Sequence, residues 1–168
     1  MPFSSERGKG YIKRMVARVP HATILDVGCG SGAYAAMFDD ALITGVEIWE
    51  PYVQKYNLES LYDNLIIADA RMWKPADGVH YDVAIAGDVL EHMTGEEAKA
   101  LLRKLREIAD TVVVSIPLGH YPQDEWEGNP YERHVVDDWS HERAVEAFGK
   151  PDAHCIDDFI GVYIWSKH

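Results

Sequence analysis

A glycine-rich turn carries the clearest chemical signal in this sequence. It runs Ile24-Leu25-Asp26-Val27-Gly28-Cys29-Gly30-Ser31-Gly32-Ala33, directly after an apolar run and before an expected helix. Glycine permits positive φ and lets the backbone approach a ligand closely, while a helix N-terminus offers free N–H groups. The turn therefore predicts a site for a ligand of the nucleotide type.

The residues of the turn fit the dinucleotide-binding pattern G-x-G-x-x-G/A. In that pattern an acidic residue about twenty positions later binds the ribose hydroxyls. Glu47 stands at that distance from Gly28. Polar groups also follow later apolar runs, at the carboxyl ends where parallel strands bind ligands. These groups are Asp69, Asp88, Glu91 and His92.

The elements that must position these groups follow from hydrophobic periodicity. Short apolar runs alternate with helical patterns, which predicts a parallel sheet covered on both faces. Pro51 can open one helix, and Thr94 with Glu97 forms a capping-box pattern before another helix that extends to Ala109. The runs expected to be strands are Thr23–Val27, Leu42–Val46, Leu65–Ala68, Val83–Ala86 and Thr111–Ile116.

The two ends of the chain complete one expected domain over residues 1–168. A leading helix over residues 10–19 should stop at Pro20, and Ser140 can cap a last helix that reaches Phe148. The tail predicts an antiparallel hairpin of two strands, residues 153–156 and 160–166. Between the fifth strand and the last helix, residues 117–139 are rich in Gly, Pro, Tyr and Trp, which predicts a functional loop.

Four motifs together resemble class I (Rossmann-like) S-adenosylmethionine-dependent methyltransferases of the small-molecule type. The resemblance is strong over about residues 20–117 and looser beyond, where the hairpin matches the reversed seventh strand of that family. A dehydrogenase would also need a second region to hold its substrate, for which 168 residues leave little room. The motifs are Asp26-x-Gly28-x-Gly30-x-Gly32, Gly45-Val46-Glu47-Ile48, Ile67-Ala68-Asp69-Ala70, and the stretch from Tyr81 to His92 with its D-x-x-E-H ending.

The resemblance implies an α/β fold with a doubly wound, mostly parallel seven-stranded sheet and a C-terminal antiparallel hairpin. It implies S-adenosyl-L-methionine as cofactor and S-adenosyl-L-homocysteine (SAH) as product. Glu47 would take both ribose hydroxyls, with Ile48 against adenine. Asp69 would accept from the adenine amino group, and the Ala70 N–H would meet a ring nitrogen. The full cofactor set is Asp26, Gly28, Cys29, Gly30, Gly32, Glu47, Ile48, Asp69, Ala70 and Asp88.

Three residues are candidates for the chemistry of methyl transfer. His92 can accept a proton from a hydroxyl or amine, or it can pack the turn before the next helix. Asp88 can orient the substrate, or it can hold local backbone N–H groups. His134 lies in Asn129-Pro130-Tyr131-Glu132-Arg133-His134, which resembles a segment after strand five in small-molecule methyltransferases. His134 is therefore a candidate base or substrate ligand.

The composition of the chain limits the classes of molecule that the protein is expected to bind. Lys and Arg number 16 against 28 Asp and Glu, a net charge of −12, which disfavours nucleic acid and anionic membrane as partners. Carboxylates and aromatic rings in the 117–139 loop favour a neutral or cationic small-molecule acceptor. No secretion signal or membrane span is evident, so a cytoplasmic monomer or homodimer is expected.

No metal is expected from the sequence. Asp88, Glu91 and His92 offer donor atoms, but neighbours in the chain do not by themselves build a closed ligand shell, and no H-x-x-x-H or C-x-x-C occurs. The predicted activity is methyl transfer from S-adenosylmethionine to an O or N atom of a small molecule. Two alternatives stay open: a non-catalytic cofactor-binding or partner subunit, and a methyltransferase acting on protein or RNA.

Overall fold

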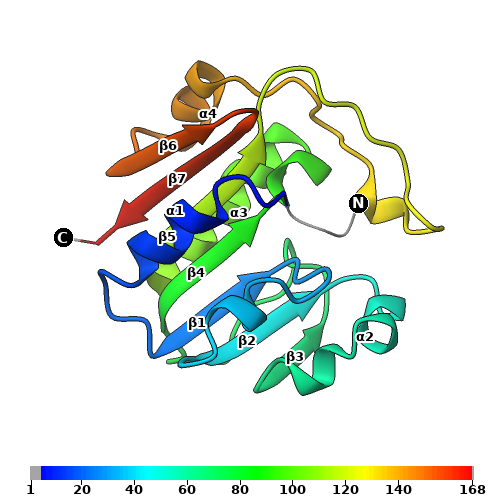
Figure 1. The fold of residues 1–168 in the computed structure, drawn as a ribbon, viewed down its shortest axis with the longest axis vertical. Coiled ribbons are helices and arrows are strands. Elements are labelled where there is room, and N and C mark those ends of the chain that lie inside the picture. The colour runs from blue at the N-terminus through cyan, green and yellow to red at the C-terminus, as the bar shows by residue number, and fades with distance from the viewer. Residues whose placement is uncertain (1–4, 168) are drawn as a thin grey trace.

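The sheet is built around β1 (Thr23–Val27), a strand that is almost wholly buried. The computed structural model describes residues 5–167 and contains a seven-stranded sheet in the order β3-β2-β1-β4-β5-β7-β6 (Figure 1). Strands β1 to β5 are parallel, and β7 is antiparallel to both β5 and β6, which confirms the predicted fold class. The other strands are β2 (Leu42–Glu47), β3 (Asn64–Ile67), β4 (Tyr81–Gly87), β5 (Ala109–Pro117), β6 (Ala153–Asp157) and β7 (Ile160–Ser166).

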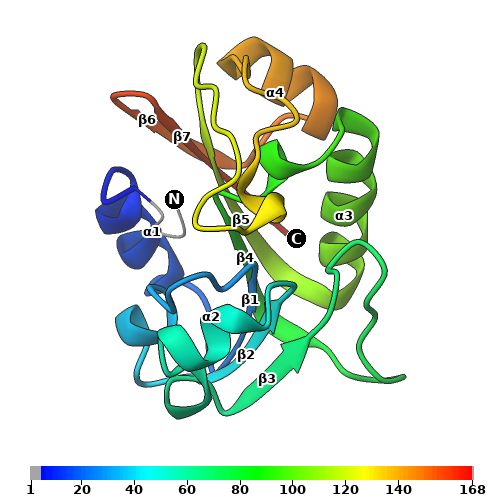
Figure 2. The same ribbon diagram turned by 90° about the vertical axis from the view of Figure 1, so that its right-hand side faces the viewer.

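Helices cover both faces of the sheet (Figure 2). Successive strand residues point to opposite faces, so Ile24 joins the core beneath α1 while Leu25 joins the core beneath α3 and α4. Apolar side chains form both cores, as expected for a parallel sheet with two covered faces. The helices are α1 (Lys9–Val16), α2 (Pro51–Lys55), α3 (Gly95–Ile108) and α4 (His141–Phe148), with short 3₁₀ turns η1 (Ala35–Met37), η2 (Leu58–Ser60), η3 (Leu90–His92) and η4 (Pro130–Glu132).

The predicted caps are confirmed, with one boundary corrected. The Thr94 hydroxyl accepts from the Glu97 N–H at 3.3 Å, and the Glu97 carboxylate accepts from the Thr94 N–H at 2.9 Å. Ser140 likewise caps α4. Ala109, expected at the end of the α3 helix, is instead the first residue of β5, because it pairs with Tyr81 in extended conformation and is buried there.

The expected helix after the glycine-rich turn is absent, and this prediction was wrong. Residues 33–41 contain the single 3₁₀ turn η1 instead. The backbone bonds of this segment mix two spacings, because the Ala36 and Phe38 N–H groups donate to carbonyls four residues back while the Met37 N–H donates to the Tyr34 carbonyl three residues back. The segment is therefore a series of turns, and no α-helix N-terminus faces the glycine-rich turn.

The leading helix is also shorter than predicted. α1 ends at Val16, because the Arg18 and Val19 N–H groups bond to carbonyls three residues back and tighten the chain ahead of Pro20. Within residues 5–167, none of the helices has the length and apolar character needed to cross a membrane.

Gly45 on β2 tests how tightly the glycine-rich turn packs on the sheet. A Cβ at this position would lie 2.7 Å from Cys29 Sγ and 2.8 Å from the Tyr62 ring. Gly45→Ala should therefore lower the free energy of unfolding by about 1–3 kcal/mol in urea denaturation. The control is Gly95→Ala, where a Cβ meets nothing within 4 Å. An equal effect of both substitutions would contradict the packing argument.

Candidate active site

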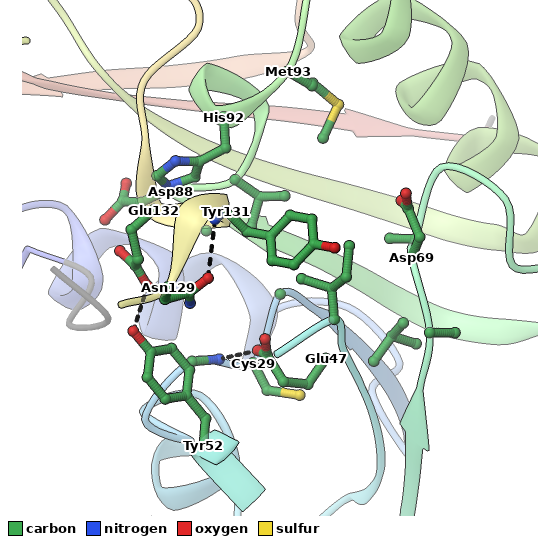
Figure 3. A pocket seen from close by; sticks show the side chains of 18 of the residues that line it. Cys29, Glu47, Tyr52, Asp69, Asp88, His92, Met93, Asn129, Tyr131 and Glu132 are labelled. Carbon is green, nitrogen blue, oxygen red and sulfur yellow. Dashed lines mark hydrogen bonds between the residues drawn. The ribbon is translucent and has the colours of Figure 1, made fainter. Parts of the chain in front are cut away.

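An open cavity lies at the carboxyl ends of β1, β2 and β4 (Figure 3). It contains about 850 Å³ of empty space, including its open mouth, which suits a ligand the size of a modified nucleoside. Ala33 and Val46 lie among its apolar lining. Nine of the residues predicted from sequence line it: Gly28, Cys29, Gly30, Glu47, Ile48, Asp69, Ala70, Asp88 and His92.

Glu47 holds the backbone on both sides of this cavity. One oxygen of its carboxylate accepts from the Gly30 N–H at 2.9 Å, and the other accepts from the Trp49 N–H at 2.8 Å. Burial raises the pKa of this carboxyl, and the two N–H donors offset part of that effect. Each carboxylate oxygen can accept more than one hydrogen bond, so both keep acceptor capacity for a ligand hydroxyl.

The glycine-rich turn needs its glycine at position 28. Gly28 has φ of 70°, and its N–H donates to the Val46 carbonyl at 2.8 Å. A Cβ there would lie 2.5 Å from Val89 Cγ2. Both the backbone angle and the close approach exclude a larger residue, so the turn lies directly on the ends of β2 and β4.

Two residues of the predicted cofactor set lie outside the cavity lining. Asp26 is fully buried under the turn, where its carboxylate accepts from the Tyr62 hydroxyl at 2.6 Å. Gly32 packs against Leu58 and Leu61 on the far side of the turn. In this structure both support the turn from beneath, and the prediction that they contact the cofactor remains a prediction.

Asp69 and Asp88 border the cavity from opposite sides (Figure 3). Asp69 pairs with Arg71 at 2.7 Å, and the hydrogen bonds from this guanidinium lower the pKa of the carboxyl. Asp88 has φ of 55°, and its carboxylate accepts from the Ser115 hydroxyl and from the Ser5 N–H, each at 3.0 Å. Asp88 therefore holds local groups, and the residue also faces the cavity.

A second cavity adjoins the first and shares Asp88 and His92 with it. Among the described residues, Glu91, Tyr121 and His134 also line it, and no Lys or Arg does. Its acidic side chains are Asp88 and Glu91, and burial raises the pKa of both carboxyls. Acidic groups with no Lys or Arg beside them in this described lining disfavour a phosphorylated or otherwise anionic ligand.

His92 and His134, the two histidines predicted from the sequence, both line this second cavity. The rings of His92 and His134 lie 4.9 Å apart in an edge contact. His92 Nδ1 lies 3.1 Å from the Arg133 carbonyl, and His134 Nδ1 lies 2.6 Å from the Tyr121 carbonyl. Burial lowers the pKa of His92 to about 4 and lowers that of His134, so both rings are neutral near pH 7.

The 117–139 loop brings His134 to this position. The Glu91 carbonyl accepts from the N–H groups of Val135 at 2.8 Å and Val136 at 3.1 Å, which fastens the loop to η3. Farther along, the Glu132 carboxylate accepts from the buried Tyr52 hydroxyl at 3.0 Å, which fastens the loop to α2. The loop thus covers both cavities and separates them from solvent on one side.

Several lining residues had not been assigned to a site from the sequence. Tyr52 and Arg71 line the first cavity, and Phe159 lines the second. Asn129, Tyr131 and Glu132, from the loop singled out in the sequence, also line the first cavity. Tyr131 also makes an edge contact with the Trp49 ring at 6.1 Å. The composition of the 117–139 loop predicted a functional role. The contact between Glu132 of this loop and Tyr52 of α2 could not be predicted, because neither segment's sequence indicates that the two lie together.

Residues 24–111, more than half of the chain, match the model of a protein family described as a methyltransferase domain. The chain belongs to this family, which confirms the resemblance found in the sequence. The family uses S-adenosylmethionine, so this is the cofactor class of the protein. No curated protein sequence matches the chain.

Solved structures show the same fold. The N-terminal domain of EvdMO1, solved with SAH bound, has 14% identity and a TM-score of 0.71, with 98% of this chain and 83% of that chain covered. The PH0226 protein from Pyrococcus horikoshii OT3 has 15% identity and a TM-score of 0.73, with 97% and 89% covered. Magnesium protoporphyrin IX methyltransferase (ChlM) from Synechocystis PCC 6803, with SAH bound, has 17% identity and a TM-score of 0.69, with 95% and 81% covered.

The buried Asp26 makes stability depend on pH. Burial raises the pKa of Asp26 to about 7, with Tyr62 and Glu47 beside it. Between about pH 4 and pH 7 the folded protein keeps a proton that the unfolded chain has released, so this group makes stability fall as pH rises, by about 1.4 kcal/mol per pH unit at most. Asn resembles the protonated acid, so Asp26→Asn should remove this contribution.

Urea denaturation at several pH values measures the effect. The stability of Asp26→Asn relative to the wild type should increase from about pH 5 to about pH 8. The exposed Asp77→Asn is the matched control for loss of one carboxylate. Parallel pH profiles for Asp26→Asn and the wild type would contradict the assignment.

Proposed function

We propose that this protein transfers a methyl group from S-adenosylmethionine to an O or N atom of a small-molecule acceptor. The observation that carries the proposal is the position of Glu47, whose carboxylate lines the first cavity while its two oxygens hold the backbone of Gly30 and Trp49. A carboxylate fixed in this way is preorganised to accept two vicinal hydroxyls, as a ribose presents them.

The cofactor would lie across the first cavity, with its ribose on Glu47. The adenine would lie on the side of Ile48, Asp69 and Ala70, and the methionine part would extend toward Asp88. This orientation directs the sulfonium methyl toward the boundary with the second cavity, because Asp88 and His92 border both spaces. The second cavity would then hold the acceptor.

Methyl transfer from a sulfonium is an in-line displacement. The bond between sulfur and the methyl carbon breaks, its electron pair stays on sulfur, and the acceptor atom forms the new bond and loses its proton. The enzyme must mainly align the two reactants and exclude water. In the proposed site, Asp88, His92 and His134 serve this alignment, since the neutral imidazoles can receive the hydrogen of an acceptor hydroxyl or amine.

The proposed acceptor is neutral or cationic. Carboxylates of Asp88 and Glu91 line the second cavity, and the aromatic rings of Tyr121 and Phe159 add apolar surface. ChlM, a magnesium protoporphyrin IX methyltransferase, supports a small-molecule acceptor by analogy of fold, at 17% identity. The acidic lining of the second cavity is the basis for the proposed acceptor class. We also propose that the protein is a monomer or a homodimer.

Calorimetry with SAH tests the cofactor site. The wild type should bind SAH, and Glu47→Gln should bind it about 10- to 100-fold more weakly, because the amide accepts through one oxygen and loses charge-assisted hydrogen bonds. The exposed Glu59→Gln is the matched control and should bind like the wild type. Absence of SAH binding to the wild type, or equal affinity in a folded Glu47→Gln, would overturn the proposed site.

Turnover with methyl-labelled S-adenosylmethionine tests the acceptor class. Three extracts are compared as acceptors: small metabolites, RNA and protein. Label should enter the metabolite fraction, since the second cavity is acidic and lacks Lys and Arg among its described lining residues. Label in RNA or protein would contradict the small-molecule proposal, and binding of SAH without any transfer would favour the non-catalytic alternative.

A further inference from the structure

Three donor groups from two distant parts of the chain converge in the second cavity. Glu91 and His92 come from η3, and His134 comes from the 117–139 loop. One carboxylate oxygen and one nitrogen of each imidazole all lie within 4.8 Å of one another. Glu91 and His92 are neighbours in the chain and do not by themselves build a closed ligand shell, but the fold adds His134 as a third donor.

In both imidazoles the same nitrogen, Nδ1, is bonded to a backbone carbonyl. A backbone carbonyl can only accept, so His92 Nδ1 donates its hydrogen to the Arg133 carbonyl, and His134 Nδ1 donates to the Tyr121 carbonyl. The Nε2 atom of each neutral ring therefore carries a lone pair. A hydrogen bond from the other ring nitrogen to a carbonyl is also the arrangement that orients histidine ligands in metal sites.

The Glu91 side chain supplies an independent sign of a missing partner. Glu91 is 1% exposed, and its Oε2 atom has no hydrogen-bond partner among the described residues. An unpaired buried carboxylate oxygen is costly in free energy, and two imidazole lone pairs beside it offer no donor. A cation at this point would satisfy all three groups at once.

The spacing and the donor types define the kind of cation. Metal–ligand bonds of about 2.1 Å place neighbouring ligand atoms about 3–3.5 Å apart, so a shift of about 1 Å brings this cluster into contact with one ion. Two imidazole nitrogens and one carboxylate oxygen suit divalent first-row transition metals, whereas Mg²⁺ and Ca²⁺ prefer oxygen ligands alone. His134 lies on a loop segment, where such a shift is readily accommodated.

We propose that Glu91, His92 and His134 bind one divalent transition-metal cation, and that an oxygen atom of the methyl acceptor occupies an open coordination position on it. The first part stands on the cluster alone. The second part rests on the proposed function, and it narrows the acceptor to a molecule with a hydroxyl group. With a cation bound, the two imidazoles would no longer receive the hydrogen of the acceptor. They would instead hold the acceptor through the cation.

The position of the cluster makes this useful for methyl transfer. His92 borders both cavities and lies near Asp88 at one end of the first (Figure 3). A cation beside His92 would therefore hold the acceptor oxygen where the sulfonium methyl is expected. A bound cation would also make a coordinated hydroxyl more acidic. Because the imidazole lone pairs would then bind the cation, the proton that methylation releases would pass to water in the open cavity.

Titration with Co²⁺ tests the metal site without any turnover assay. The protein is dialysed against EDTA, and Co²⁺ binding is followed by visible d–d absorption. The wild type should bind one Co²⁺ per chain. His134→Ala and Glu91→Gln should each weaken binding by about 100-fold or more, because a protein ligand is lost.

The controls separate ligation from folding and from cofactor binding. His154→Ala removes a histidine from another ring pair, in which His141 and His154 stack at 4.8 Å, and it should bind Co²⁺ like the wild type. Thermal unfolding and SAH calorimetry check that each variant is folded, and His134 does not line the cofactor cavity. If Glu91→Gln fails to fold, His134→Ala alone decides.

The outcomes distinguish the two proposals. SAH binding without stoichiometric Co²⁺ binding, or equal Co²⁺ affinity in His134→Ala and the wild type, overturns the metal site and leaves the cofactor site standing. Stoichiometric Co²⁺ binding that depends on His134, without SAH binding, supports the metal site and overturns the proposed function.

Discussion

The carboxylate of Glu47 fixes two segments of backbone at once, and the geometry of the site depends on it. Through Gly30 it holds the glycine-rich turn after β1, and through Trp49 it holds the entry to α2. Both bonds lie at the carboxyl ends of adjacent parallel strands, where Val27 pairs in register with Val46. A buried carboxylate is tolerated there because the two N–H donors compensate for its lost hydration.

The remainder of the site is assembled by the 117–139 loop. Its attachment to the Glu91 carbonyl and its contact with Tyr52 place one side of the loop over each cavity. Asp88 and His92 then lie where the two cavities meet. Two reactants bound in adjoining spaces, with a shared boundary at the strand ends, are what an in-line group transfer requires. A cation bound by Glu91, His92 and His134 would hold the acceptor oxygen at that boundary.

The strands were predicted well from the sequence because a strand buried on both faces is a short run of mostly apolar residues. β1 is a short run of mostly apolar residues, interrupted only by Thr23 and Asp26, and its observed bounds are those predicted. The glycine pattern and Glu47 were found from their types and spacing. The 3₁₀ turn at Ala35–Met37 was missed because the segment mixes bonds to carbonyls three and four residues back, a choice between two kinds of turn that local propensity does not encode. The meeting of Glu91 with His134 was missed because backbone bonds from Val135 and Val136 create it, and such bonds carry no residue-type signal.

The central claim is that S-adenosylmethionine lies across the first cavity with its ribose on Glu47 and its sulfur toward the second cavity. A crystal structure of the protein with SAH bound tests it most directly. Both ribose hydroxyls are expected within hydrogen-bond distance of the Glu47 carboxylate, and the sulfur is expected beside Asp88 and His92. SAH in the second cavity, or a ribose without contact to Glu47, would contradict it.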